Sequence, residues 1–196
     1  MSMDDLEART QKELIDIVAV LMELTGLPSR WSGRVELVPE AEFKGRKRAI
    51  CDIQIDAALA TQDARWATLI HEALHSVSAD YSGVDFRTAP GWEEGVVEKL
   101  QRMFRPVILT RINITVDPAT FVSGETQHQY NKYIEVLISL SQTLNYTEEQ
   151  FFYDLLKMPI RQRPTFVFGL GNQLPGQKRI DFFRLFSVAN SLLKDY

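Results

Sequence analysis

Hydrophobic residues recur at helical spacing in several long stretches of the chain. Between Asp4 and Leu24 they form one stripe, and the Gly-Leu-Pro sequence that follows can stop a helix, so this stretch is predicted to be helical. The same spacing predicts helices over three later stretches: 127–144, 147–158 and 177–194. Residues 160–176 have no clear period and are expected to be irregular, including the Gly-Leu-Gly-Asn sequence at 169–172.

Hydrophobic and polar residues alternate in three shorter stretches. The first two, Arg34–Val38 and Ala49–Asp56, predict strands of a short N-terminal sheet. The third, Arg111–Val116, alternates as well and is also expected to be a strand. Between the first two lies a basic run, Lys44–Arg48, which is interpreted as a solvated turn.

The chemically most informative stretch runs from Asp63 to Tyr81, where no Pro or Gly interrupts a helical pattern. Its apolar stripe consists of Trp66, Leu69, Ile70, Ala73, Leu74 and Val77. The helix also carries an H-E-x-x-H sequence, in which His71 and His75 share one face. Both imidazoles can therefore reach one metal ion, with Glu72 close by as a general base. The alternative is a chance match on an ordinary amphipathic helix.

A third metal ligand is expected at Glu94, which eighteen residues separate from His75. Glu94 lies in a predicted helix over 92–104, which begins after a Pro-Gly pair and ends before a proline. Zinc needs a third protein ligand of this kind and an open position for water. Glu98, one turn further on, is expected to accept the N–H of a ligating imidazole and so fix its tautomer.

These residues resemble the gluzincin metallopeptidases, the clan of thermolysin and the zinc aminopeptidases. In that clan, as in this chain, H-E-x-x-H is followed at a similar distance by a glutamate within an E-G-x-x-E turn of helix. The matched positions are His71, Glu72, His75, Glu94 and Gly95, with Glu98 beside them. The resemblance covers about 35 residues, and residues 76–90 contain no third histidine of the kind that metzincins carry.

The resemblance implies an α+β fold. A small zincin-like domain is expected, with a short N-terminal sheet, an H-E-x-x-H helix, a glutamate helix and a mainly helical C-terminal subdomain. The whole chain, 1–196, would be this one domain, with the zinc site in 1–106 and the helical subdomain in 107–196. One Zn²⁺ per chain is expected. The strand at 49–56 would form the rim of the cleft and pair with extended substrate.

The resemblance also implies hydrolysis of peptide bonds. Zinc lowers the pKa of a bound water, and Glu72 takes the proton of that water and passes it to the leaving amine. Relatives stabilise the oxyanion with a Tyr or His from the downstream part, and the candidates here are His128, Tyr130 and Tyr133. Signatures that bind a substrate's amino terminus are absent, which favours an endopeptidase over an aminopeptidase.

Two other functions stay open at this point. One is a catalytically inactive or latent zincin-fold module that binds or regulates a partner, which would hold metal without hydrolysis. The other is a zinc hydrolase that acts on a non-peptide bond, which a small closed pocket would favour over an open groove.

Composition and charge narrow the range of partners. A net charge of −4 argues against non-specific binding of nucleic acid, which needs a basic surface. The single cysteine excludes an intrachain disulfide. The acidic start resembles no signal peptide and no apolar run is long enough to span a bilayer, so a cytoplasmic protein without membrane contact is expected. The expected partner is a protein or peptide substrate, and the oligomeric state is open.

Overall fold

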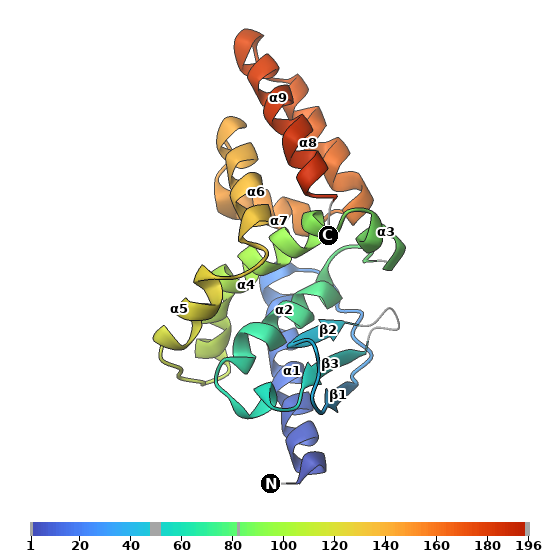
Figure 1. Cartoon of the computed structure of the whole chain (residues 1–196), viewed down its shortest axis with the longest axis vertical. Helices are drawn as coiled ribbons and strands as arrows, with labels where there is room; N and C mark the ends of the chain where they lie inside the picture. Colours follow the sequence, from blue (N-terminus) through green and yellow to red (C-terminus); the bar gives the residue numbers. More distant parts are fainter. Residues whose placement is uncertain (1, 48–51, 82, 195–196) are drawn as a thin grey trace. The chain divides into compact units, whose positions relative to one another are not determined.

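The computed structural model describes residues 2–47, 52–81 and 83–194 (Figure 1). The described chain combines helices with one three-stranded sheet, which confirms the predicted α+β class. By its contacts the chain divides into two compact units. Unit 1 comprises Met1–Val77 with Gln101–Thr126, and unit 2 comprises Ser78–Leu100 with Gln127–Tyr196. The predicted division of a single domain at residue 106 stays a prediction.

Unit 1 begins with the long helix α1 (Met3–Thr25), close to the predicted 4–24. Ser2 caps its start, because the Ser2 side chain accepts the N–H of Asp5 while Asp5 accepts the N–H of Ser2. The hydrogen bonds from Ser2 hold the pKa of the Asp5 carboxyl below its usual value. Gly26 ends the helix at φ 68°, a left-handed conformation that glycine adopts without strain.

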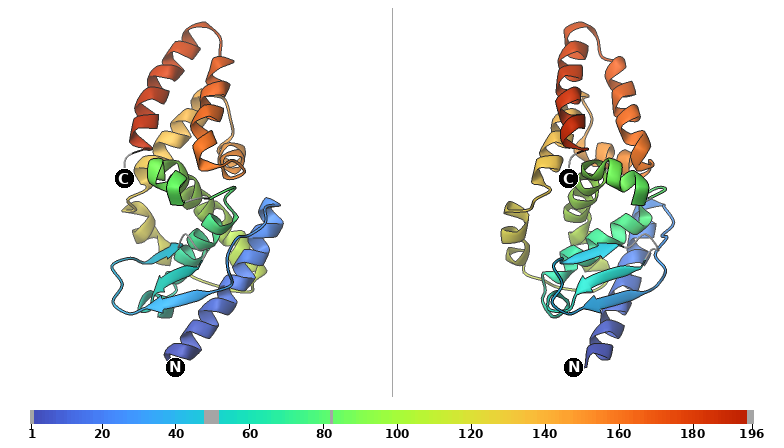
Figure 2. Two further views of the ribbon diagram at one scale, coloured as in Figure 1. Left: turned by 90° about the vertical axis from the view of Figure 1, so that its right-hand side faces the viewer. Right: turned by 45° about the vertical axis from the view of Figure 1, so that its right-hand side comes forward.

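The sheet of unit 1 consists of β1 (Val35–Val38), β2 (Gly45–Lys47) and β3 (Ile53–Asp56), in the order β1-β3-β2. β3 pairs with β1 in parallel and with β2 antiparallel, so β3 is the central strand (Figure 2). The proposal that the strand at 49–56 forms the rim is therefore wrong for residues 53–56; residues 49–51 lie outside the described part of the chain. The interpretation of the basic run as a solvated turn is also wrong for residues 45–47, which form the outer strand β2.

The remaining elements of unit 1 are η1 (Leu59–Thr61), α2 (Arg65–Val77), the later part of α4 (Pro90–Arg111) and α5 (Ala119–Thr126). α1 packs against α2 and β1, while α2 packs against β2. Arg65 at the start of α2 binds both carboxylate oxygens of Glu13 on α1, at 2.9 and 3.1 Å. Such a two-pronged pair adds geometric specificity to the apolar packing of the two helices.

Unit 2 is helical in its described residues. Its elements are α3 (Gly83–Thr88), the start of α4, α6 (Asn131–Thr143), α7 (Glu148–Leu156), η2 (Ile160–Gln162), α8 (Arg163–Asn172) and α9 (Gly176–Leu192). The helices α6, α7 and α9 correspond to those predicted over 127–144, 147–158 and 177–194. The Thr147 side chain accepts the N–H of Gln150 at the start of α7 and so caps that helix.

Two predictions around Pro106 are wrong. α4 continues through this proline to Arg111, although a proline inside a helix removes one hydrogen bond and costs about 3 kcal/mol. Buried side chains on both sides of it, Leu100 and Ile108, anchor the helix and offset that cost. The strand expected over 111–116 does not form, because Asn113 adopts a φ of 58° and turns the chain away from the helix.

The expectation of irregular structure over 160–176 is also wrong, since α8 occupies most of that stretch. A glycine inside a helix is unfavourable by itself, and two of them at 169 and 171 weakened the helical pattern. At Gly171, however, a Cβ atom would lie 1.9–2.8 Å from ring atoms of Phe182 on α9. The missing side chain at Gly171 therefore makes room for the contact between α8 and α9.

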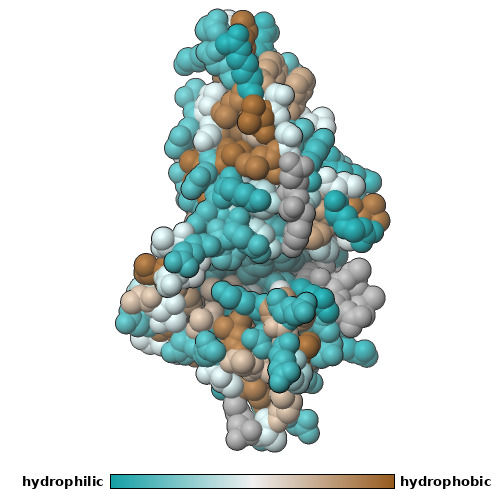
Figure 3. Space-filling model, viewed as in Figure 1, coloured by the Kyte–Doolittle hydropathy of each residue, from teal (hydrophilic) through white to brown (hydrophobic). Residues whose placement is uncertain are grey.

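Exposed hydrophobic side chains gather on these last two helices. Phe168 of α8 is 44 % exposed, and Ile180 and Val188 of α9 are 48 % and 71 % exposed. Figure 3 shows hydrophobic residues on the surface in the region of α8 and α9. Within the described ranges, none of the helices has both the length and the apolar character that crossing a bilayer requires.

The two glycines of α8 provide a matched test of this packing. Gly171→Ala should lower the free energy of unfolding by roughly 1–3 kcal/mol, because the new methyl group overlaps Phe182. Gly169→Ala should raise it by up to about 1 kcal/mol, since nothing lies within 4 Å of that position and alanine favours a helix. Urea unfolding measures both, and equal effects of the two variants would contradict the account.

Candidate metal centre

The helix α2 positions the two histidines. The residues of its predicted apolar stripe, Trp66, Leu69, Ile70, Ala73, Leu74 and Val77, are all at most 1 % exposed. The side of the helix that carries the polar motif is buried as well, with His71, Glu72 and His75 exposed by 9 %, 5 % and 4 %. A helix normally leaves its polar face to solvent, so this burial sets the motif apart from an ordinary amphipathic helix.

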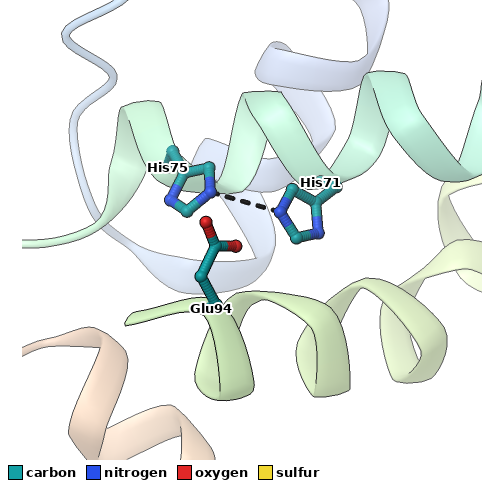
Figure 4. Close-up of side chains that lie close together, drawn as sticks. All are labelled: His71, His75 and Glu94. Carbon is teal, nitrogen blue, oxygen red and sulfur yellow. Dashed lines mark hydrogen bonds between the residues drawn. The ribbon is translucent and has the colours of Figure 1, made fainter. Parts of the chain in front are cut away.

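The two imidazole rings face one another across one turn of α2. Nε2 of His75 lies 3.2 Å from Nε2 of His71, and the rings meet edge to face with centroids 4.9 Å apart (Figure 4). Two nitrogens bound at 2.0–2.1 Å to one tetrahedral ion would lie roughly 3.3 Å apart. The separation of the ring nitrogens therefore fits a shared metal ion.

Glu94 belongs to the first turns of α4, which begins at Pro90. Proline suits this position because the first residue of a helix has no hydrogen-bond partner for its N–H. Glu94 is 5 % exposed, and its carboxylate points toward the histidine pair (Figure 4). Ligand atoms of His71, His75 and Glu94 all lie within 4.8 Å of one another. The three residues predicted as metal ligands thus form one buried group that can hold a metal ion.

Glu72 lies beside the outer strand β2. A Cβ atom added to Gly45 would come within 3.1 Å of both Cγ and Oε1 of Glu72, and within 2.5 Å of Cγ2 of Thr68. A side chain at this position would overlap Thr68 and press on Glu72, so glycine leaves room for both. Sequence reasoning missed Gly45 because the basic residues around it indicated a turn; the glycine itself was the available signal, since glycine in a strand often marks a close approach.

Glu98 lies one turn after Glu94 on α4 and is 5 % exposed. Its Oε2 is 3.9 Å from Nε2 of His128, the third histidine of the chain. Nδ1 of His128 accepts the backbone N–H of Tyr130 at 3.4 Å, so the neutral ring carries its proton on Nε2, the nitrogen that faces Glu98. The predicted bond from Glu98 to a ligating imidazole stays a prediction.

The three aromatic candidates form a row at the start of α6. The rings of His128 and Tyr130 meet edge to face at 5.0 Å, and those of Tyr130 and Tyr133 stack at 6.0 Å. Tyr133 is only 2 % exposed, and its atoms occupy the space that a Cβ at Gly91 or Gly95 would need. Gly95 therefore lets α4 approach α6, and Tyr133 fills the resulting contact.

Comparison with models of known protein families, with curated proteins and with solved structures gives no significant match.

The metal centre can be tested without any assumption about catalysis. A divalent transition metal at about 100 times its Kd should stabilise the wild-type protein by about 2.7 kcal/mol, because it binds only the folded chain. The His75→Ala variant should lose this stabilisation by metal, because one of the three residues that can bind the ion is gone. His128→Ala is the matched control and should keep it. Thermal unfolding with and without Zn²⁺, Co²⁺ or Ni²⁺ measures the difference, and an equal shift in both variants would contradict the site.

Proposed function

We propose that this chain is a zinc-dependent metallopeptidase that hydrolyses peptide bonds, with Glu72 as the general base. One observation carries the proposal: the buried group of His71, His75 and Glu94, with Glu72 next to His71 in the sequence. Two imidazoles and one carboxylate are a ligand set of catalytic zinc sites, which leave a further position for water. When bound, zinc polarises a carbonyl oxygen and makes a water molecule more acidic.

Glu72 would move the proton during hydrolysis. A carboxylate oxygen of Glu72 takes a proton from the attacking water, and the same oxygen later gives it to the nitrogen of the leaving amine. The surroundings support this role, because Glu72 is 5 % exposed and β2 passes beside its side chain at Gly45, where an added Cβ atom would lie 3.1 Å from Cγ and Oε1. A buried side chain of this kind has fewer positions open to it when the water is bound.

The strand β2 is the proposed binding edge for the substrate, in place of the strand at 49–56. Within the described sheet, β2 pairs with β3 on one side and has no strand on the other. An extended peptide can add to such an edge through main-chain hydrogen bonds. Because Glu72 lies 3.1 Å from the position that a Cβ atom at Gly45 of β2 would take, a peptide on this edge would pass close to the general base.

Among the three candidates for the oxyanion donor, the contacts favour His128. Its side chain is 26 % exposed, and the bond from Tyr130 N–H leaves the proton on Nε2, which can donate. Tyr133 is buried by its packing against α4, so a structural role suits it better. Tyr130 is half-buried beside His128 and stays a second candidate.

Glu72→Gln tests the reaction. This variant should keep its fold and about one zinc per chain, because the three proposed ligands are untouched, but its rate of peptide cleavage should fall by roughly 10²–10⁴-fold. Elemental mass spectrometry gives the zinc content, and a mixed peptide library analysed by mass spectrometry gives the cleavage. Glu149→Gln, at an exposed position of α7, is the control and should cleave as the wild type does.

The outcomes separate the alternatives. Unchanged cleavage in Glu72→Gln would overturn the assigned base. Zinc in the wild type without cleavage of any peptide would favour the latent or regulatory module or a zinc hydrolase that acts on a non-peptide bond. A wild type that takes up no zinc would overturn the proposal as a whole.

Gly45→Ala tests the contact between β2 and the general base. The added methyl group should push Thr68 and Glu72 out of place and lower cleavage at least 10-fold, while the zinc content stays at the wild-type level. Thr68→Ser removes the methyl group that lies nearest, so it should restore part of the rate in the Gly45→Ala background. Gly124→Ala, with nothing within 4 Å, is the control. A wild-type rate in Gly45→Ala would rule out this contact as a requirement.

A further inference from the structure

Arg163 is a fully buried arginine at the start of α8. Its side chain is 0 % exposed, as is that of its partner Glu93, and Nη1 lies 2.7 Å from Oε2 of Glu93. Burial lowers the pKa of the Arg163 guanidinium from its usual value, while Glu93 acts in the opposite direction. A pair of charges removed from water in this way is expensive unless further hydrogen bonds complete it.

Besides a bond to Met158, the other hydrogen bonds of Arg163 reach two short stretches of the chain, at Ser78 and at Trp92. Nη1 donates to the carbonyl oxygen of Trp92 at 2.6 Å, and Nη2 donates to the hydroxyl of Ser78 at 2.8 Å. Ser78 in turn donates to Glu93 at 3.0 Å, which closes a ring of three side chains. Nε donates to the carbonyl oxygen of Met158 at 3.2 Å. The guanidinium thus fixes Ser78 and the Trp92–Glu93 turn to one another.

Both of these stretches lead directly to proposed metal ligands. Ser78 lies three residues after His75 and directly follows the last residue of α2. Glu93 immediately precedes Glu94 on α4. Successive residues of a helix point about 100° apart around its axis, so holding Glu93 fixes the rotation of the first turn of α4 and thereby the direction of Glu94.

We propose that Arg163 is a positioning residue for the metal ligand Glu94: through Glu93, Trp92 and Ser78 it fixes the orientation in which α4 presents that carboxylate. The inference rests on the proposed zinc site and adds a residue to it that lies 69 positions later in the chain. Arg163 touches neither substrate nor metal in this account. It acts by holding the turn that carries Glu94, and groups that orient ligands typically change metal affinity 10–100-fold when removed.

The experiment is a comparison of zinc affinities by competition with a chromophoric chelator. Arg163→Met alone would leave the charge of Glu93 buried without its partner, so the test variant is Arg163→Met/Glu93→Met, which removes both charges. Its zinc affinity should be 10–100-fold weaker than that of the wild type. In a Glu94→Ala background the same pair of substitutions should change the affinity less than 2-fold, because the ligand through which Arg163 acts is absent.

A purely structural role would give a different pattern. The matched control is Arg105→Met/Glu125→Met, which removes an ion pair from the later part of α4 and should leave the zinc affinity unchanged. Equal affinities of the folded wild type and the Arg163/Glu93 variant, or equal weakening in the Glu94→Ala background, would overturn the inference alone. A wild type that binds no zinc would instead overturn the metal site and the inference together. If circular dichroism shows that the double variant does not fold, the same comparison with Arg163→Lys decides, because lysine keeps the charge but lacks the planar guanidinium whose nitrogens reach Glu93, Trp92, Ser78 and Met158 together.

Discussion

Burial of charged and polar side chains is the constraint on which this fold depends. The buried histidines and glutamates of α2 and α4 are His71, Glu72, His75, Glu93, Glu94 and Glu98. Each buried charge costs several kcal/mol of hydration, whereas a domain of ordinary stability has only about 5–15 kcal/mol in total. Such a set persists only if each charge is compensated. Arg163 compensates Glu93 inside unit 2, and a metal ion held by the two histidines and Glu94 would compensate part of the remainder.

Close approach of helices and strands is the second requirement, and glycine meets it at several places in the described part of the chain, Gly45, Gly95 and Gly171 among them. Gly45 lets β2 lie against Glu72, Gly95 lets α6 lie against α4, and Gly171 lets α9 lie against α8. In each case a methyl group would come within about 3 Å of a neighbouring side chain. These glycines act through the space they leave and not through backbone conformation, since none of the three has a positive φ.

The proposed chemistry depends on few residues, which explains how a recognisable motif can occur in a chain without a match to known families. A zinc site needs three donors and a base, and these occupy two short helical stretches. Residues such as Gly45 and Arg163 lie outside those stretches and support them through tertiary contacts, so a motif search does not find them.

The sequence by itself determined what local periodicity and spacing encode. The extent of α1, the buried stripe of α2 and the shared face of His71 and His75 could be predicted, because helical geometry relates residues three and four apart directly. Glu94 could be predicted from its spacing after His75 and from the helix pattern around it. Tertiary structure decided the rest. Pro106 and Gly171 reduce helix propensity, yet packing of neighbouring residues overrides that local cost. The outer position of β2 and the contacts of Arg163 join residues far apart in the chain, and no local pattern specifies which distant segments will meet.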